Sequence, residues 1–283
     1  MIPNEFEYRR AASVEEAIAF LSEGAGEATL LAGGHSLIPL MKLRLSEPGI
    51  LVDISRIPEL RGIERQGDTI TIGAATTHAE LARSALLLAE APIVAEAAAE
   101  IGDAQVRNRG TIGGSLAHSD PAADLPAVMV ALDAQFTLAG PQGLRTVAAE
   151  DFFLEVLTVD LADGEILTAV DFQAARSAAY AKLVQRASRF ALVGVAVSLS
   201  IEGARCASAR VAVTGASSHA QRLRAVEAAL VGATLPAAAA EATETAGDEL
   251  DFVNVDLHGS AEYRRAMVAV FARRAVEAAA ARA

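Results

Sequence analysis

Cysteine is almost absent from this 283-residue chain, in which Cys206 is the only one. A single thiol can form no intrachain disulfide and cannot hold an iron–sulfur cluster through thiolates. Any iron–sulfur chemistry would therefore belong to another chain. Among the histidines, His78 and His118 have no second ligand at a useful spacing. We expect them to be solvated or capping residues rather than metal ligands.

Basic residues and long apolar runs are also scarce. The chain has 24 Lys and Arg against 36 Asp and Glu, which gives a formal net charge of −12. This balance disfavours nucleic acid and anionic membranes as partners. Apolar runs such as 191–201 are too short to span a bilayer, and the first residues lack the pattern of a signal peptide. We expect a cytoplasmic protein without a membrane span.

Two glycine-rich stretches carry the most distinctive pattern. The first is Leu30-Leu-Ala-Gly-Gly-His-Ser-Leu-Ile-Pro39, and the second runs from Arg107 to Pro126 and contains Thr111-Ile-Gly-Gly-Ser115. Glycines allow backbone N–H groups to approach a ligand closely, and successive free N–H groups form an anion-binding concavity. Two such loops suggest a ligand with several oxygens, such as a dinucleotide diphosphate. Two ordinary tight turns remain the alternative.

The remaining pattern predicts an α+β chain of about two domains. Capping boxes at Ser13–Glu16 and Thr77–Glu80 predict helix starts. Further helices are expected at 85–101 (interrupted at Pro92), 151–157, 220–230, 236–247 and 261–280. Strands are expected at 6–9, 28–32, 50–54, 61–64, 69–72, 134–139, 144–148, 165–172, 179–185, 193–201 and 207–214. A change in composition near 173–177 predicts the domain boundary at about residue 175.

Several segments together resemble one known family. They are Ala32–Met41, Thr111–Ala117 with Asp120–Asp124, Gly164–Thr168, Tyr180–Leu183 with Arg186–Phe190, and Asp256–Arg265. In this order they resemble the FAD-binding medium subunit of molybdenum hydroxylases, as in carbon monoxide dehydrogenase, and the related domain of xanthine dehydrogenase. The resemblance covers nearly the whole chain. No Gly-x-Gly-x-x-Gly follows a strand, so the Rossmann mode of dinucleotide binding is disfavoured.

The resemblance implies a two-lobed FAD-binding domain of the p-cresol methylhydroxylase and vanillyl-alcohol oxidase type over 1–175, with lobes at about 1–57 and 58–175. An α+β C-terminal domain of the carbon monoxide dehydrogenase flavoprotein type would cover 176–283. The implied cofactor-binding residues are Leu31, Ala32, Gly33, Gly34, His35, Ser36, Leu37, Thr111, Ile112, Gly113, Gly114, Ser115, His118, Asp120, Asp124, Leu167, Lys182 and Phe190. The resemblance implies no catalytic residue and no metal ligand on this chain.

Some of these residues have a second interpretation. Asp124 is expected to accept from ribose or ribityl hydroxyls, or else to cap a helix. Asp120 could form only an Asx-turn before Pro121. Phe190 matches the place where an aromatic, often Tyr, covers one face of the isoalloxazine ring in some relatives, and a core Phe is the alternative. For His35 the hypothesis is non-covalent FAD, although a Gly-Gly-His loop attaches the flavin in some oxidases of this superfold.

The function implied is electron transfer within a larger complex. Electrons from iron–sulfur clusters on a small subunit would pass through FAD here to an external acceptor, after substrate oxidation at a molybdopterin centre on a large subunit. Relatives commonly assemble as a dimer of heterotrimers. The alternatives are a self-sufficient flavin oxidase or reductase and a scaffold without FAD. The substrate of the complex, the acceptor (NAD, quinone, a cytochrome or oxygen) and the oligomeric state of the isolated chain stay open.

Overall fold

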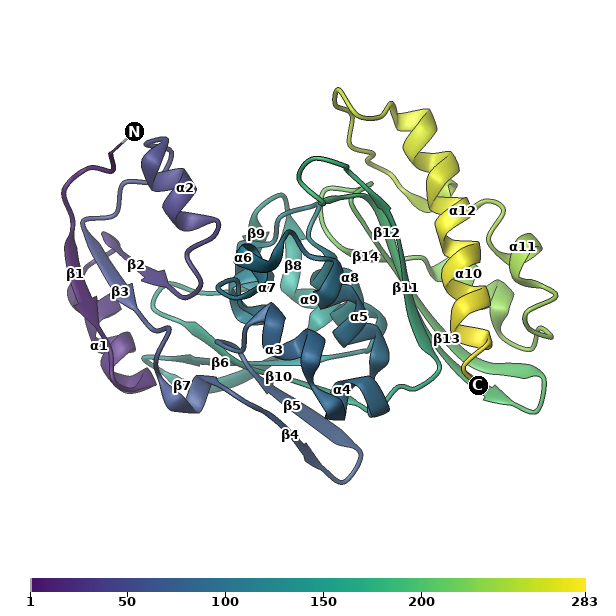
Figure 1. Ribbon diagram of the computed structural model, residues 1–283, viewed down its shortest axis with the longest axis horizontal. Coiled ribbons are helices and arrows are strands. Elements are labelled where there is room, and N and C mark those ends of the chain that lie inside the picture. The colour runs from purple at the N-terminus through teal and green to yellow at the C-terminus, as the bar shows by residue number, and fades with distance from the viewer. Residues whose placement is uncertain (1) are drawn as a thin grey trace.

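The computed structural model describes residues 2–283, which form three blocks along the long axis of the molecule (Figure 1). The first block is a parallel three-stranded sheet in the order β1-β3-β2. Ser13 starts its first helix by accepting a hydrogen bond from the N–H of Glu16. Its elements are β1 (Glu7–Arg10), α1 (Val14–Glu23), β2 (Ala28–Leu31), α2 (Leu37–Lys42), β3 (Ile50–Asp53) and the 3-10 turn η1 (Pro58–Leu60).

The middle block is an antiparallel five-stranded sheet in the order β4-β5-β10-β6-β7. Helices cover one face of this sheet (Figure 1). The strands are β4 (Ile63–Gln66), β5 (Thr69–Gly73), β6 (Gln135–Gly140), β7 (Gly143–Ala148) and β10 (Ile166–Gln173), with a small separate pair β8 (Phe153–Glu155) and β9 (Thr158–Val159). The helices are α3 (His78–Arg83), α4 (Ala85–Glu90), α5 (Pro92–Glu100), α6 (Ala104–Arg107), α7 (Ile112–His118), α8 (Asp124–Ala131) and α9 (Ala149–Phe152).

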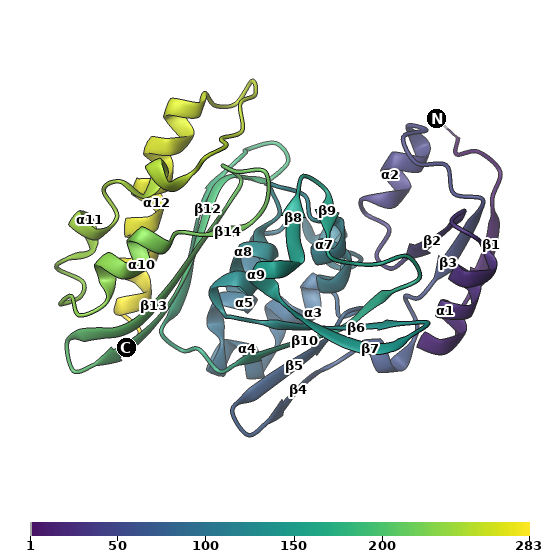
Figure 2. The same cartoon turned by 180° about the vertical axis from the view of Figure 1, so that it is seen from behind.

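The third block is an antiparallel sheet in the order β11-β12-β13-β14. Its outer face is covered by helices that include the long α12, whereas α5 and α8 of the middle block pack on its inner face (Figures 1 and 2). The elements are β11 (Ala178–Val184), β12 (Ala191–Glu202), β13 (Arg205–Thr214), β14 (Gln221–Arg222), α10 (Arg224–Leu230), α11 (Ala239–Ala242), the 3-10 turn η2 (Ala246–Glu249) and α12 (Ala261–Ala280).

The α+β class is confirmed, and most elements lie where the sequence predicts them. Three helix predictions are wrong in part. At 151–157 the chain leaves α9 after Phe152 and continues as β8, because Phe152 and Phe153 both pack edge-on against Phe136. At 220–230 the first residues pair with β13 as β14. The segment 236–247 forms only α11 and the start of η2.

Packing explains why the last of these helices is interrupted. A Cβ at Gly247 would lie 2.3 Å from the carbonyl oxygen of Arg265, so the backbone here lies directly against α12. Glu249 then accepts hydrogen bonds from the N–H groups of Ala225 and Val226 at 2.8 and 3.0 Å. These contacts to distant residues replace the helical continuation that local pattern suggests.

Candidate cofactor site

The two glycine loops lie directly against each other. A Cβ at Gly33 would lie 2.2 Å from the carbonyl oxygen of Arg109 and 2.8 Å from the Cα of Gly110. A Cβ at Gly114 would lie 4.0 Å from the Cβ of Ala32. Real Cβ atoms do not approach backbone at 2.2 Å, so glycine at position 33 is what lets the loops meet. Loops about eighty residues apart in sequence thus form one surface, between α2 and α7 (Figure 1).

The first loop presents a row of unpaired backbone donors. The segment follows β2, turns at Gly34 with a φ of +74°, and enters α2. None of the described residues accepts a hydrogen bond from the backbone N–H groups of Gly33, Gly34, His35, Ser36 and Leu37. The hydroxyl of Ser36 also has no partner among them and does not cap α2. Consecutive free N–H groups of this kind form a concavity suited to an anion.

The second loop differs, because the chain itself satisfies most of its amides. The N–H of Gly113 donates to the carbonyl of Ala74 at 2.8 Å, and that of Gly114 donates to the hydroxyl of Thr111 at 3.2 Å. The N–H of Ser115 donates to the carbonyl of Thr111. The backbone N–H of Thr111 and the hydroxyl of Ser115 keep no partner among the described residues. This loop therefore offers fewer donors than its glycines suggest.

His78 lies beneath the second loop, and the expectation that it is solvated or capping is wrong. It is 5% exposed, and Thr77 rather than His78 caps α3, in a complete capping box with Glu80. A Cβ at Gly110 would lie 2.9 Å from its Nε2, and its Nδ1 has no hydrogen-bond partner. Burial lowers the pKa of His78 to about 4, and the nearby positive charges of His35 and Arg107 add to this shift. The ring is therefore neutral at pH 7.

Asp124 lies in a buried polar cluster at the start of α8. Its carboxylate accepts a hydrogen bond from the hydroxyl of Tyr180 at 2.6 Å and pairs with the ammonium of Lys182 at 2.9 Å. The side chains of Lys182 and Asp124 are only 1% and 4% exposed. The residue that precedes the helix is Ala123, so Asp124 is not the helix cap. Its pairing with residues of β11 joins the middle block to the third block.

Charges in this cluster influence each other strongly. Burial raises the pKa of Asp124, and the ammonium of Lys182 and the hydroxyl of Tyr180 oppose that shift. Burial also raises the pKa of Tyr180 well above its ordinary value. The half-buried Glu100 at the end of α5 has a pKa raised by burial, with Lys182 acting in the opposite direction. The ammonium of Lys182 thus donates both to the carboxylate of Asp124, at 3.0 Å, and to the backbone carbonyl of Glu100, at 3.4 Å.

Phe190 lies at the surface, so the alternative of a core phenylalanine is wrong. It is 47% exposed and lines a pocket of about 430 Å³ together with Asp120, Leu192 and Asn254. Asp120 accepts a hydrogen bond from the N–H of Ala122 at 2.8 Å, which is the Asx-turn that its position before a proline suggests. An exposed aromatic next to a polar pocket is free to contact a ligand.

The apolar members of the predicted set serve mainly the core. Ile112 is fully buried and Leu167 is 4% exposed in β10, where the register shifts at the next residue. Leu31 and Leu37 flank the first loop and are half-buried. His118 ends α7 and is also half-buried. The backbone of Thr168 accepts from Ala74, which in turn accepts from Gly113, so β10 supports the second loop directly.

Sequence reasoning missed two participants. Tyr180 lies two residues before Lys182 on β11, and alternate residues of a strand share one face, so strand periodicity could have found it. His78 gave no such signal, because its burial depends on the loop that covers it. Among residues 2–283, no group of three His, Cys, Asp or Glu side chains could hold a metal ion. No helix in this range is long and apolar enough to cross a membrane.

Comparisons with known proteins agree with this geometry. A family model described as the FAD binding domain in molybdopterin dehydrogenase matches residues 4–172. A second, described as the CO dehydrogenase flavoprotein C-terminal domain, matches residues 178–279. The fold and site thus define an FAD-binding component of an oxidoreductase. The chain belongs to the family of FAD-binding medium subunits of molybdenum hydroxylases.

Similar proteins match along nearly their full length. The carbon monoxide dehydrogenase medium chain of Hydrogenophaga pseudoflava is 42% identical over 285 residues, covering 100% of this chain and 99% of that protein. Subunit alpha of the 6-hydroxypseudooxynicotine dehydrogenase complex of Paenarthrobacter nicotinovorans is 39% identical, covering 97% of this chain and 94% of that protein. A solved carbon monoxide dehydrogenase from H. pseudoflava that lacks the Mo-pyranopterin moiety superposes with a TM-score of 0.95 at 44% identity, covering 100% of this chain and 99% of that chain.

Proposed function

We propose that this chain transfers electrons, through FAD held at the two glycine loops, from a partner subunit with iron–sulfur clusters to an external acceptor. The observation that carries the proposal is the row of unpaired N–H groups from Gly33 to Leu37, packed against the second loop. A diphosphate supplies the oxygen acceptors that such a row lacks, and charge-assisted bonds of this type are roughly twice as strong as neutral ones. Neither loop contains a lysine, so backbone donors carry this role.

The chain's own residues hold and surround the cofactor. The hydroxyls of Ser36 and Ser115 are free to add donors beside the N–H row. Lys182, paired with Asp124 at 2.9 Å, supplies one buried positive charge at the boundary between the blocks. Phe190 offers an exposed aromatic face at the neighbouring pocket. Bound FAD supplies the chemistry, namely the conversion between one-electron and two-electron transfer. We assign no catalytic acid or base to the chain.

The partners follow from the absence of cluster ligands. Cys206 is buried and is the only cysteine, so the clusters and the molybdopterin centre would lie on a small and a large subunit, in an assembly that we propose to be a dimer of heterotrimers. Relatives that are named as medium chains or as subunits of dehydrogenase complexes support this division. We infer a cytoplasmic location for the chain, as its sequence leads us to expect.

Domain limits and the state of the flavin belong to the same proposal. We place the domain boundary at about residue 175, between the end of β10 and the start of β11, and the lobe boundary near residue 57, between β3 and β4. We infer that FAD is not covalently attached at His35, whose Nδ1 already lies 3.1 Å from the carbonyl oxygen of Gly33. Flavin fluorescence that stays with the polypeptide after acid precipitation would contradict this.

The decisive experiment measures FAD retention by the chain purified alone and with its neighbouring subunits. Wild-type chain is expected to hold FAD in at least one of these states, and Gly33→Ala is expected to lose it because the new Cβ meets the backbone of Arg109. Gly49→Ala is the matched control, since its Cβ meets only the side chain of Glu27, whose flexible carboxylate is the nearest group at 3.0 Å. A wild-type chain that never binds FAD refutes the proposal. Substrate turnover by the chain alone would favour the self-sufficient oxidase instead.

A further inference from the structure

Helix α8 is held by a carboxylate at each end. Its residues from Asp124 to Ala131 are all buried, and Asp124 at the start pairs with Lys182 and Tyr180 of β11. Two residues after the helix, Asp133 turns with a φ of +48° and directs its own carboxylate to the same sheet. Eight helical residues span about 12 Å. The two carboxylates therefore contact the C-terminal block at well-separated points.

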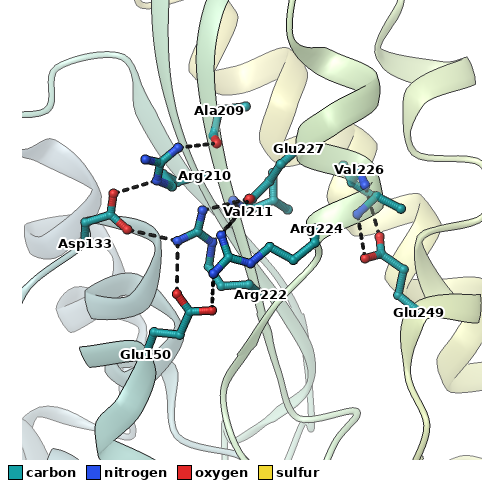
Figure 3. Close-up of polar contacts among 11 residues, drawn as sticks. Asp133, Glu150, Ala209, Arg210, Val211, Arg222, Arg224, Val226, Glu227 and Glu249 are labelled. Atoms are coloured by element: carbon teal, nitrogen blue, oxygen red, sulfur yellow. Dashed lines mark hydrogen bonds and ion pairs between the residues drawn. The ribbon is translucent and has the colours of Figure 1, made fainter. Parts of the chain in front are cut away.

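The far end of α8 is anchored by arginines of the C-terminal block (Figure 3). Asp133 pairs with Arg210 of β13 at 2.5 Å and with Arg222 of β14 at 2.9 Å. Glu150 of α9 forms a second connection, to Arg224 and, at 3.5 Å, to Arg222. Both carboxylates belong to the middle block. All three arginines belong to the third block, which is the C-terminal block of the chain.

Arg222 is held by contacts within the C-terminal block that do not involve Asp133. Its side chain is only 3% exposed and forms a two-pronged pair with Glu227 of α10. Glu227 in turn accepts a hydrogen bond from the N–H of Val211 in β13 at 2.8 Å. Bidentate pairs between arginine and carboxylate have a defined geometry. The guanidinium is thus a rigid part of the C-terminal sheet, and Asp133 docks onto it.

Between the two ends, the contact is made by small side chains. Ala178, Ala196 and Ala212 of the C-terminal sheet belong to the same buried cluster as the residues of α8. Apolar contact has no preferred direction, and alanine offers little relief to interlock with a helix. This surface brings helix and sheet close together but does little to fix their register. Polar contacts at the two ends supply that constraint. At the near end the hydroxyl of Thr214 also donates to the carbonyls of Pro121 and Ala123, at 2.9 and 2.8 Å.

We propose that Asp133 and Arg222 are positioning residues of the cofactor site: their ion pair fixes the C-terminal sheet along α8 and so holds Lys182 and Tyr180 on Asp124. The constraint within the chain follows from the contacts described, while its effect on FAD rests on the proposed function. Loss of the far pair lets β11 shift relative to α8, and the ammonium of Lys182 is then held less firmly at the site.

The test uses full-length chain and Asp133→Asn. Asparagine tolerates the left-handed backbone at this position, so the substitution removes the charge with little backbone strain. Asp163→Asn is the control, because Asp163 is exposed and forms no ion pair among the described residues. Without FAD, hydrogen exchange of the amides of β11 is expected to be at least about fivefold faster in Asp133→Asn than in the control. Exchange of β11 at the wild-type rate overturns the positioning role, whether or not FAD binds.

A double-mutant cycle tests the link to the cofactor. Asp133→Asn is expected to weaken FAD binding about fivefold in the wild-type background, but less than about twofold when Lys182→Met is already present. Sites this far apart with no shared partner normally act additively. Equal effects in the two backgrounds overturn the proposal that Asp133 acts through Lys182. Arg222→Met also leaves the buried Glu227 without its cation, so the cycle is read on Asp133→Asn alone.

Discussion

Acidification should destabilise the fold through His78, which is buried without a partner for its Nδ1. Its pKa is about 4 in the folded chain against an ordinary value of 6.5. Between these values the unfolded chain binds the proton more strongly, so the contribution of His78 to stability falls as the pH drops from 6.5 toward 4. At 1.36 kcal/mol per pKa unit, the full pKa shift of His78 corresponds to about 3 kcal/mol in the free energy of unfolding. Between pH 7 and pH 5 the loss is about 2 kcal/mol.

The measurement is urea unfolding followed by far-UV circular dichroism at pH 7 and pH 5, for wild type, His78→Asn and His258→Asn. Asn cannot take up the proton, so His78→Asn should show a pH-dependent loss smaller than that of wild type by about 2 kcal/mol. His258 is exposed, and its variant should retain the wild-type dependence. A loss of stability in His78→Asn as large as in wild type would show that the ring is not held neutral by burial.

Three further outcomes follow from the contacts around the site. Lys182→Met should cost about 3 kcal/mol in thermal or urea unfolding because it leaves Asp124 buried without its cation, and adding Asp124→Asn should restore part of that loss. Gly194→Ala should displace the Tyr180 hydroxyl, which lies 2.1 Å from the position of the new Cβ, and shift the near-UV absorption of that phenol; an unchanged spectrum would contradict the packing. Ser36→Ala should weaken FAD binding in a fluorescence titration about fivefold, the value of one hydrogen bond, with unchanged binding showing that the hydroxyl does not face the cofactor.

Much of the fold could be read from local pattern. Ser13 and Thr77 cap the helices that their capping boxes predict, and α12 covers 261–280 as expected. These signals depend on residues three or four positions apart, which the sequence displays directly. The wrong helix at 151–157 has the opposite cause, because Phe152 and Phe153 are held by Phe136 across the sheet.

The candidate site likewise combines features that local sequence pattern predicts with features that only the folded chain reveals. The glycines predicted both loops. Their composition does not show that the first loop keeps its N–H groups free, whereas the second pairs most of its N–H groups with Ala74 and Thr111. That difference arises from contacts across the chain. The bond between Tyr180 and Asp124 joins residues 56 positions apart, and only the folded sheet brings them together.

The cluster at Asp124 also constrains the order in which the protein can be completed. The ribosome makes the N-terminal domain first, and domains generally fold as units during synthesis. Lys182, however, follows Asp124 by 58 residues, so in a nascent chain that ends before β11 the carboxylate of Asp124 has no cation to pair with. The polar cluster at Asp124 is therefore completed only after β11 has been synthesised, so the first part of the chain cannot form all its final contacts before that point.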